Sequence, residues 1–295
     1  MSLERCCWPA LAWLMVSTAQ ADGANRHSAT VTVQGDENDN RQWLSKLAVP
    51  LADHAWLQAS IGRTELAGAA ASDSQTVGAA LGAGNASLDA AVEFAQRRGD
   101  ARFKQRDWAA TLNWHGASGG LGADAFLRSA RGTSQSSSPS DGVFAPPTTT
   151  TVRESVSSQG FGLHGHLVLT PQVTVFGGAM RYRHDFTVDA NATQTAAPLS
   201  SLLEMPAGLS GVWRDQAYID RSYRIGGRYR LPNAAVSAQY FRDRISNTGA
   251  ASSTAQLQAE FLLAGHWLVS PMVGLSYVDS NRQVGFGGLT VGYVW

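Results

Sequence analysis

The sequence predicts an all-β protein, a transmembrane antiparallel up-and-down β-barrel of about fourteen strands, with twelve as the nearest alternative. Apolar residues recur at every second position in many short segments, as in strands that have one apolar face. Tight turns and longer connections alternate between these segments. After the N-terminal region, no segment approaches the run of about 20 apolar residues that a membrane-spanning helix needs. Strands are therefore the expected spanning elements.

The first 21 residues predict a cleaved secretory signal peptide. A basic residue stands near the start, residues 8–16 are apolar, and Ala19, Gln20 and Ala21 form a small-residue cleavage site. The apolar run is too short for a membrane anchor. Both cysteines lie in this segment, so the remaining residues, 22–295, are expected to form one barrel domain without disulfides.

The composition narrows the function classes. Charged residues make up 16% of the chain and the formal net charge is zero, which disfavours a nucleic-acid partner. The sequence also shows no glycine-rich phosphate loop, and no cofactor and no metal are expected.

The N-terminal half supplies seven predicted strands, several with alanine-rich apolar faces. Tight turns at residues 50–53, 84–86 and 115–120 join them in pairs. The predicted strands are residues 29–34, 43–49, 55–63, 77–83, 88–94, 108–114 and 121–127.

The C-terminal half supplies seven more strands with larger apolar residues. Proline, glycine or asparagine occupies each tight turn, at residues 170–172, at 232–233 and at Gly265, as hairpin turns require. The predicted strands are residues 159–169, 173–187, 218–231, 234–245, 256–264, 266–279 and 285–295.

The last predicted strand has an aromatic end. Leu289, Val291, Tyr293 and Trp295 share one face at period two. A strand of this kind is expected to be paired, because an exposed apolar edge invites aggregation. We expect it to close the barrel against a first strand that begins near Ala29.

The longer connections are expected at the end of the barrel opposite the tight turns. The two longest are predicted near residues 132–155 and 188–216. The first is rich in serine, threonine and proline, which predicts a mobile loop. The second is partly apolar, which predicts either a segment folded in or over the barrel mouth, or a loop packed on its neighbours.

The signal peptide, the turn asymmetry and the aromatic last strand together resemble the Gram-negative outer-membrane β-barrels, porin-like in the broad sense and without a specific subfamily. The resemblance implies an outer-membrane location with tight turns in the periplasm. It also implies contact with outer-membrane lipid and lipopolysaccharide, and recognition by the barrel-assembly machinery through the C-terminal strand. A soluble β-sandwich is the alternative, but it would not show this turn asymmetry.

If the apolar faces contact lipid, the opposite faces line the lumen. Acidic residues then gather on the fifth to seventh strands and arginines on the ninth and tenth, which predicts a field across a water-filled pore. The alternative is that these charges form salt bridges that brace the wall. The lumen-lining candidates are Asp89, Glu93, Asp124, Arg128, Arg181, Arg183, Arg224, Arg228, Arg230 and Glu260.

Three functions remain open from the sequence. The first is a narrow water-filled channel for small polar solutes. The second is a non-channel barrel that serves a secretion or polysaccharide-export system, or a surface adhesin. The third is a lipid-modifying enzyme, for which no catalytic motif is found.

Histidines are the residues that would support catalysis or metal binding, and the support is weak. His164 and His166 are expected to face the lumen, with Ser237 and Asp185 on nearby strands, and His184 is expected to face lipid. Because no motif places a nucleophile or a third ligand, we predict lumen histidines without a catalytic or metal role.

Overall fold

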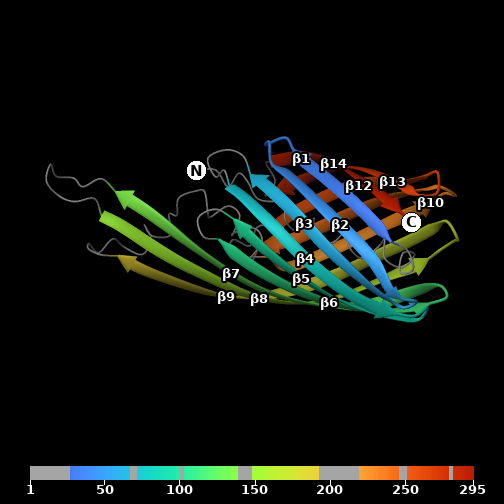
Figure 1. The fold of residues 1–295 in the computed structure, drawn as a ribbon, viewed down its shortest axis with the longest axis horizontal. Helices are drawn as coiled ribbons and strands as arrows, with labels where there is room; N and C mark the ends of the chain where they lie inside the picture. Colours follow the sequence, from blue (N-terminus) through green and yellow to red (C-terminus); the bar gives the residue numbers. More distant parts are fainter. Residues whose placement is uncertain are drawn as a thin grey trace.

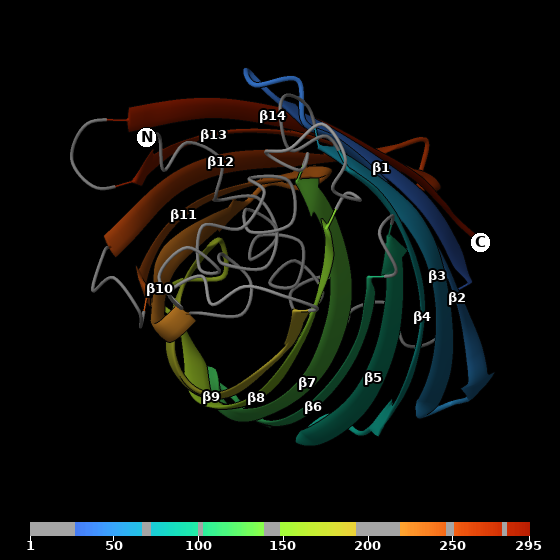
Figure 2. The same ribbon diagram turned by 90° about the vertical axis from the view of Figure 1, so that its left-hand side faces the viewer.

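Fourteen antiparallel strands form one closed barrel within the described part of the chain (Figures 1 and 2). The computed structural model describes residues 27–66, 72–99, 103–138, 148–192, 219–245, 251–278 and 282–295. The predicted fold class and strand number are confirmed. The predicted signal peptide lies outside the described residues. Within them, no helix is long and apolar enough to cross a membrane.

Each strand pairs with its neighbours in sequence, and β1 pairs with β14. The strands are β1 (Ser28–Asp36), β2 (Arg41–Ala52), β3 (Ala55–Leu66), β4 (Ser72–Gly84), β5 (Leu88–Gly99), β6 (Lys104–Gly116), β7 (Gly119–Ser138), β8 (Thr148–Val168), β9 (Val173–Ala192), β10 (Ile219–Arg230), β11 (Ala234–Ile245), β12 (Ala251–Leu263), β13 (Trp267–Val278) and β14 (Arg282–Val294).

The barrel closes through its terminal strands, as the aromatic end of the sequence predicts. Ser28 lies opposite Val294, and the pairing continues to Asp36 opposite Phe286. Beyond it, the backbones of His27 and Trp295 exchange two hydrogen bonds of 3.1 and 3.0 Å. Along this pairing, β1 and β14 therefore leave no free edge.

The two ends of the barrel differ. Short turns that join β2 to β3, β4 to β5 and the later hairpins lie at the end where the chain terminates, here called the turn end. At the other end, the loop end, β7, β8 and β9 run well beyond the remaining strands (Figure 1). The tight turns thus fall where the sequence predicts them.

The bounds predicted for the longest connections are too wide. Pairing between β7 and β8 continues to Ser138 opposite Thr148, so most of the predicted loop 132–155 belongs to these strands. β9 likewise continues to Ala192, past the predicted start of the loop 188–216. Threonine and its β-branched relatives favour extended backbone, which explains why a threonine run read as loop forms strand. Residues 139–147 and 193–218 lie outside the described part.

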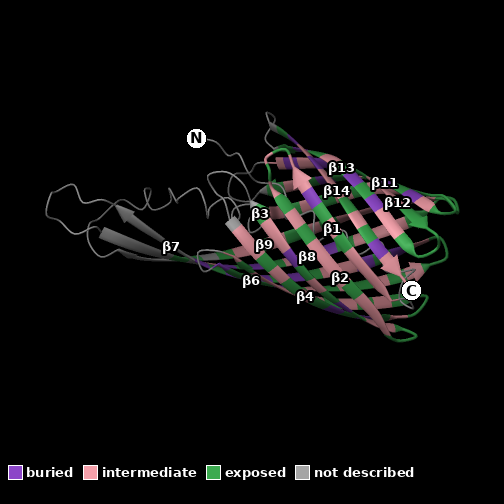
Figure 3. Ribbon diagram, turned by 45° about the horizontal axis from the view of Figure 1, so that its top comes forward, coloured by how far each residue is buried: buried purple, intermediate pink, exposed green. Residues whose placement is uncertain are grey.

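Exposed and less exposed residues alternate along the strands (Figure 3), and the exposed face is apolar. Aromatic side chains on this outer face gather toward both ends, as expected at the two membrane interfaces. Trp114, Tyr229, Trp267 and Trp295 lie near the turn end, and Trp43, Tyr223 and Tyr277 lie near the loop end.

The last strand places its aromatic face outward. Leu289, Val291 and Trp295 are exposed on the outer face, with Trp295 at 51%. Tyr293 lies between two tryptophans, with ring centroids 4.9 Å from Trp267 and 5.8 Å from Trp295. This aromatic cluster sits at the turn end beside the closing pair.

The faces predicted for β9 are wrong. Arg181 lies opposite Phe161 of β8, and Phe161 is exposed on the outer face. Arg181 and Arg183 therefore point outward, away from the lumen. The inner face of β9 carries Phe176, Met180, Tyr182 and His184 instead, so the expected lipid-facing position of His184 is also wrong.

Glycines on neighbouring strands make room for the inward aromatic residues of β9. A Cβ at Gly226 would lie 2.6 Å from Phe176 Cζ, and a Cβ at Gly160 would lie 2.8 Å from Tyr182 Cδ1. The two rings thus occupy space that the glycines leave open. The apolar residues at every second position of β9 therefore pack against the inner wall and do not contact lipid.

Candidate functional site: the inner wall of the barrel

Most of the candidates predicted from sequence lie on the inner face. Arg181 and Arg183 are the exceptions described above. The inward residues are Asp89, Glu93, Asp124, Arg128, Arg224, Arg228, Arg230 and Glu260.

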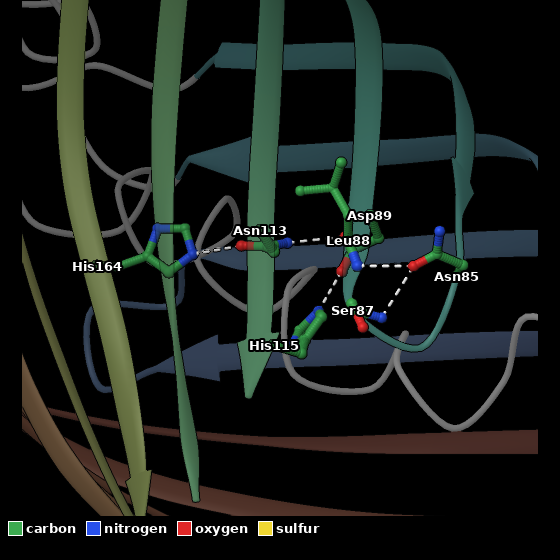
Figure 4. A network of polar contacts seen from close by, with 7 residues as sticks. All are labelled: Asn85, Ser87, Leu88, Asp89, Asn113, His115 and His164. Carbon is green, nitrogen blue, oxygen red and sulfur yellow. Dashed lines mark hydrogen bonds and ion pairs between the residues drawn. The ribbon is translucent and has the colours of Figure 1, made fainter. Parts of the chain in front are cut away.

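One row of inner positions runs across six strands, from β5 to β10. The register aligns Asp89, Asn113, Gly122, His164, Gly178 and Arg224. Within this row the Asn113 amide donates to Asp89 Oδ2 at 2.8 Å. His164 Nε2 lies 2.7 Å from Asn113 Oδ1 (Figure 4).

His164 is held on both sides. Its Nδ1 lies 2.7 Å from Asp124 Oδ2, and Thr111 donates to the other oxygen of Asp124 at 2.9 Å. Both ring nitrogens of His164 therefore face side-chain oxygen atoms. Asp124 lies beside the aligned row, two positions from Gly122 on β7. We call the set Asp89, Asn113, His164, Asp124 and Arg224 the polar row.

Two glycines allow the polar row to form. A Cβ at Gly122 would overlap His164 Nε2 and Asn113 Oδ1, so the two side chains meet directly over β7. A Cβ at Gly178 would lie 2.9 Å from His164 Cβ and 3.3 Å from Arg224 Nε. Larger residues at these positions would separate the polar groups from one another.

A second contact lies nearer the turn end. His115 Nε2, on β6, forms a hydrogen bond with Asp89 Oδ1 (Figure 4), so both carboxylate oxygens of Asp89 have a polar partner. The rings of His115 and His166 approach to 5.9 Å over β7, where Gly120 stands between them. Both histidines predicted to face the lumen do so.

The charges continue onto β10 and β12. Arg228 Nη2 lies 2.6 Å from Glu260 Oε2 across β11. On β11, Ser237 lies opposite Arg228, and Ala235 lies opposite Glu260. Arg224 lies within electrostatic range of Asp124. Together with the polar row, these residues give β5 to β12 a charged inner wall.

The remaining inner wall is mainly uncharged. Hydroxyl and amide groups from β12, β13, β14 and β1 bond to each other, as between Thr32 and Thr290 at 2.9 Å and between Gln258 and Ser270 at 2.9 Å. Among the described side chains of this part of the wall, Lys46 of β2 is the cation that points inward. It interacts electrostatically with Glu93. The inner surface thus has one charged half and one hydroxyl-rich half.

One ion pair on the inner face is buried. Arg128 Nε lies 2.8 Å from Asp107 Oδ1, with side chains 8% and 4% exposed. Gln105 also donates to Asp107 at 2.6 Å, and the Arg128 guanidinium lies 5.0 Å from the centre of the Phe126 ring. These contacts support the alternative that some inward charges brace the wall, and Arg128 is one of them.

Sequence reasoning missed a serine and histidine pair near the loop end. Ser158 Oγ lies 2.8 Å from His184 Nδ1, while His184 Nε2 lies 2.7 Å from the Ile219 carbonyl oxygen. Ser158 is 2% exposed, so its hydroxyl is closed to a substrate. The pair links β8, β9 and β10, and only the register between these strands could have revealed it.

The residues considered for catalysis do not meet. Asp185 is exposed on the outer face, whereas His164 and Ser237 lie on the inner face. His164 contacts Asp124 and Asn113 instead. Across the described ranges, no group of three or more histidine, cysteine or acidic residues is placed to hold a metal ion.

Comparison with known proteins finds likeness in fold alone. No protein-family model and no curated protein sequence matches the chain. Among solved structures, the CymD monoaromatic hydrocarbon channel aligns with a TM-score of 0.57 and 9% identity, over 91% of this chain and 87% of CymD. The KdgM porin aligns with a TM-score of 0.43 and 9% identity, over 90% and 98% of the two chains. A bacterial polysaccharide outer membrane secretin aligns with a TM-score of 0.47 and 9% identity, over 92% and 99%.

Three findings indicate the same architecture. They are the closed barrel, its apolar exterior with two aromatic zones, and the fold that the chain shares with CymD. The protein has the architecture of a Gram-negative outer-membrane β-barrel, porin-like in the broad sense.

Proposed function

We propose that the barrel forms a narrow water-filled channel for small polar solutes. The observation that carries this proposal is the partial exposure of charged side chains on the inner face. Asp89 is 37% exposed and Asp124 28%, and Arg228 and Glu260 are 23% and 24% exposed. Charged groups of this kind are stable where water reaches them.

The width of the barrel supports the same function. Barrels of eight strands are filled by their own side chains, whereas those of sixteen to eighteen leave an aqueous channel. Fourteen strands fall between these cases and suit a narrow lumen. CymD, a solved barrel of the same fold, is described as a monoaromatic hydrocarbon channel.

The wall chemistry favours polar solutes over hydrocarbons. Carboxylates and guanidinium groups on β5 to β12 provide hydrogen bonds of both polarities to a passing solute. The hydroxyl and amide groups of the remaining wall offer weaker, uncharged contacts. A small molecule with several polar groups would exchange its hydrogen bonds to water for hydrogen bonds to this surface.

Reconstitution of the mature chain in a planar lipid bilayer tests the proposal. We expect discrete conductance steps that depend on inserted protein and are absent from bilayers with heat-unfolded protein. Protein that is folded, as judged by its heat-dependent mobility on a gel, but gives no conductance would overturn the channel and favour a non-channel barrel.

A further inference from the structure

Five outward arginines form a patch near the loop end. Arg181 of β9 lies opposite Arg221 of β10, and Arg221 lies opposite Arg244 of β11. Arg183 and Arg242 lie two positions away on β9 and β11, on the same face. All five are exposed. We call Arg181, Arg183, Arg221, Arg242 and Arg244 the arginine patch.

This arrangement carries an electrostatic cost. Side chains directly opposite each other on neighbouring strands have Cβ atoms about 5 Å apart, and like charges at that spacing destabilise a sheet. The described side chains supply one ion pair to the patch, from Arg221 Nε to Asp220 Oδ2 at 3.4 Å. Asp185 is exposed on the same face of β9. An external anion would offset the remaining positive charge.

The patch lies where the membrane interface is expected. Phe161 lies opposite Arg181, and Tyr223 lies opposite Arg242. Both aromatic residues are exposed on the outer face, and exposed aromatics mark the level of lipid headgroups in transmembrane barrels. The arginines extend from these residues toward the loop end. Their guanidinium groups are therefore at the depth of headgroups in one leaflet.

A second basic row lies at the loop ends of β5 to β7. Arg98 lies opposite Lys104, and Lys104 lies opposite Arg131. All three are exposed on the outer face. Positive charge thus extends around the outer rim from β5 to β11. The opposite sector differs, since Arg63 of β3 is paired with Asp73 at 2.6 Å.

We propose that the arginine patch is a binding site for the phosphate groups of lipopolysaccharide in the outer leaflet. Guanidinium groups bind phosphate oxygens through paired, charge-assisted hydrogen bonds. The patch presents several such groups in one row, which matches a lipid with more than one phosphate. The bound phosphates would neutralise the like charges on β9, β10 and β11.

The test measures binding of lipopolysaccharide to the purified barrel in detergent. Unmodified protein, the triple variant Arg181→Gln, Arg221→Gln, Arg244→Gln and the control Arg63→Gln are compared. We expect the triple variant to bind at least about tenfold more weakly and the control to bind like the unmodified protein. Equal binding by the triple variant and the unmodified protein would overturn the proposal.

Three further arms identify the ligand. Lipopolysaccharide stripped of phosphate should bind the unmodified protein about as weakly as the triple variant binds the intact lipid. Inorganic phosphate at millimolar concentration should not displace the lipid, and phosphatidylglycerol should bind more weakly. Retained binding without phosphate, displacement by free phosphate, or equal binding of phosphatidylglycerol each contradicts the assignment. Heat-dependent gel mobility establishes that every variant is folded, and an Arg→Lys triple variant should recover part of the affinity.

Discussion

His164 Nε2 lies 2.7 Å from Asn113 Oδ1, although the residues are 51 positions apart and a whole strand, β7, separates them. The contact exists because Gly122 of β7 has no side chain to block it. Hydrogen bonds thereby connect polar side chains of three strands at one level of the barrel.

Substitution of Gly122 by alanine should destabilise the barrel by about 1 to 3 kcal/mol. The new Cβ would overlap His164 Nε2 and Asn113 Oδ1, so the polar row would have to open. Denaturant unfolding in lipid vesicles measures the loss. Gly287→Ala is the matched control, because its Cβ would meet its nearest atom, Met272 O, at an ordinary 3.6 Å. Equal effects of the two substitutions would contradict the role of Gly122.

The two inward ion pairs should differ in their contribution to stability. Arg128→Met leaves Asp107 buried without its partner and should cost about 3 to 5 kcal/mol. Arg228→Met leaves Glu260 partly solvated and should cost less than about 1 kcal/mol. Unfolding free energies of both variants provide the measurement. If both variants lose a similar amount of unfolding free energy, the burial of Asp107 and Arg128 does not make their ion pair the more stabilising one.

The regular features of this chain were accessible to sequence reasoning. Turns with proline, glycine or asparagine separate the strands, and the outer apolar face repeats at period two, so strand number and turn positions were predicted. Period two defines two faces but does not say which one is inside. On β9, hydrophobicity predicts that Phe176 and Tyr182 face lipid, but both rings pack inward over glycines. Arg181 and Arg183 point outward as a result.

Contacts between residues far apart in the sequence cannot be predicted without the register of the strands. The Ser158 and His184 pair depends on the alignment of β8 with β9, which no local pattern encodes. Inward glycines were the available signal for the polar row. Gly122 and Gly178 alternate with bulky polar residues on the flanking strands, and a predicted register would have brought those residues together.

Ion selectivity should depend on inward arginines and not on outward ones. The double variant Arg224→Gln, Arg228→Gln removes two positive charges from the inner wall and frees Glu260 from its partner, so the permeability ratio should shift toward cations. The control Arg181→Gln, Arg183→Gln removes the same charge from the outer face. Reversal potentials in a bilayer without lipopolysaccharide measure both. An unchanged ratio in the inner variant, or an equal shift in the control, would contradict a path along this wall.

The facing of β9 can be tested directly with single cysteines, since both native cysteines lie in the predicted signal peptide. Ala179 lies opposite Leu163, which is exposed on the outer face, whereas Met180 is on the inner face. A nitroxide label on Ala179→Cys should therefore collide readily with oxygen dissolved in the bilayer. The same label on Met180→Cys should collide less with oxygen and should be more immobile, because it projects toward Gly160 and Gly162 of β8. The reverse pattern would restore the face assignment predicted from sequence, returning Arg181 and Arg183 to the lumen and removing the basis of the arginine patch.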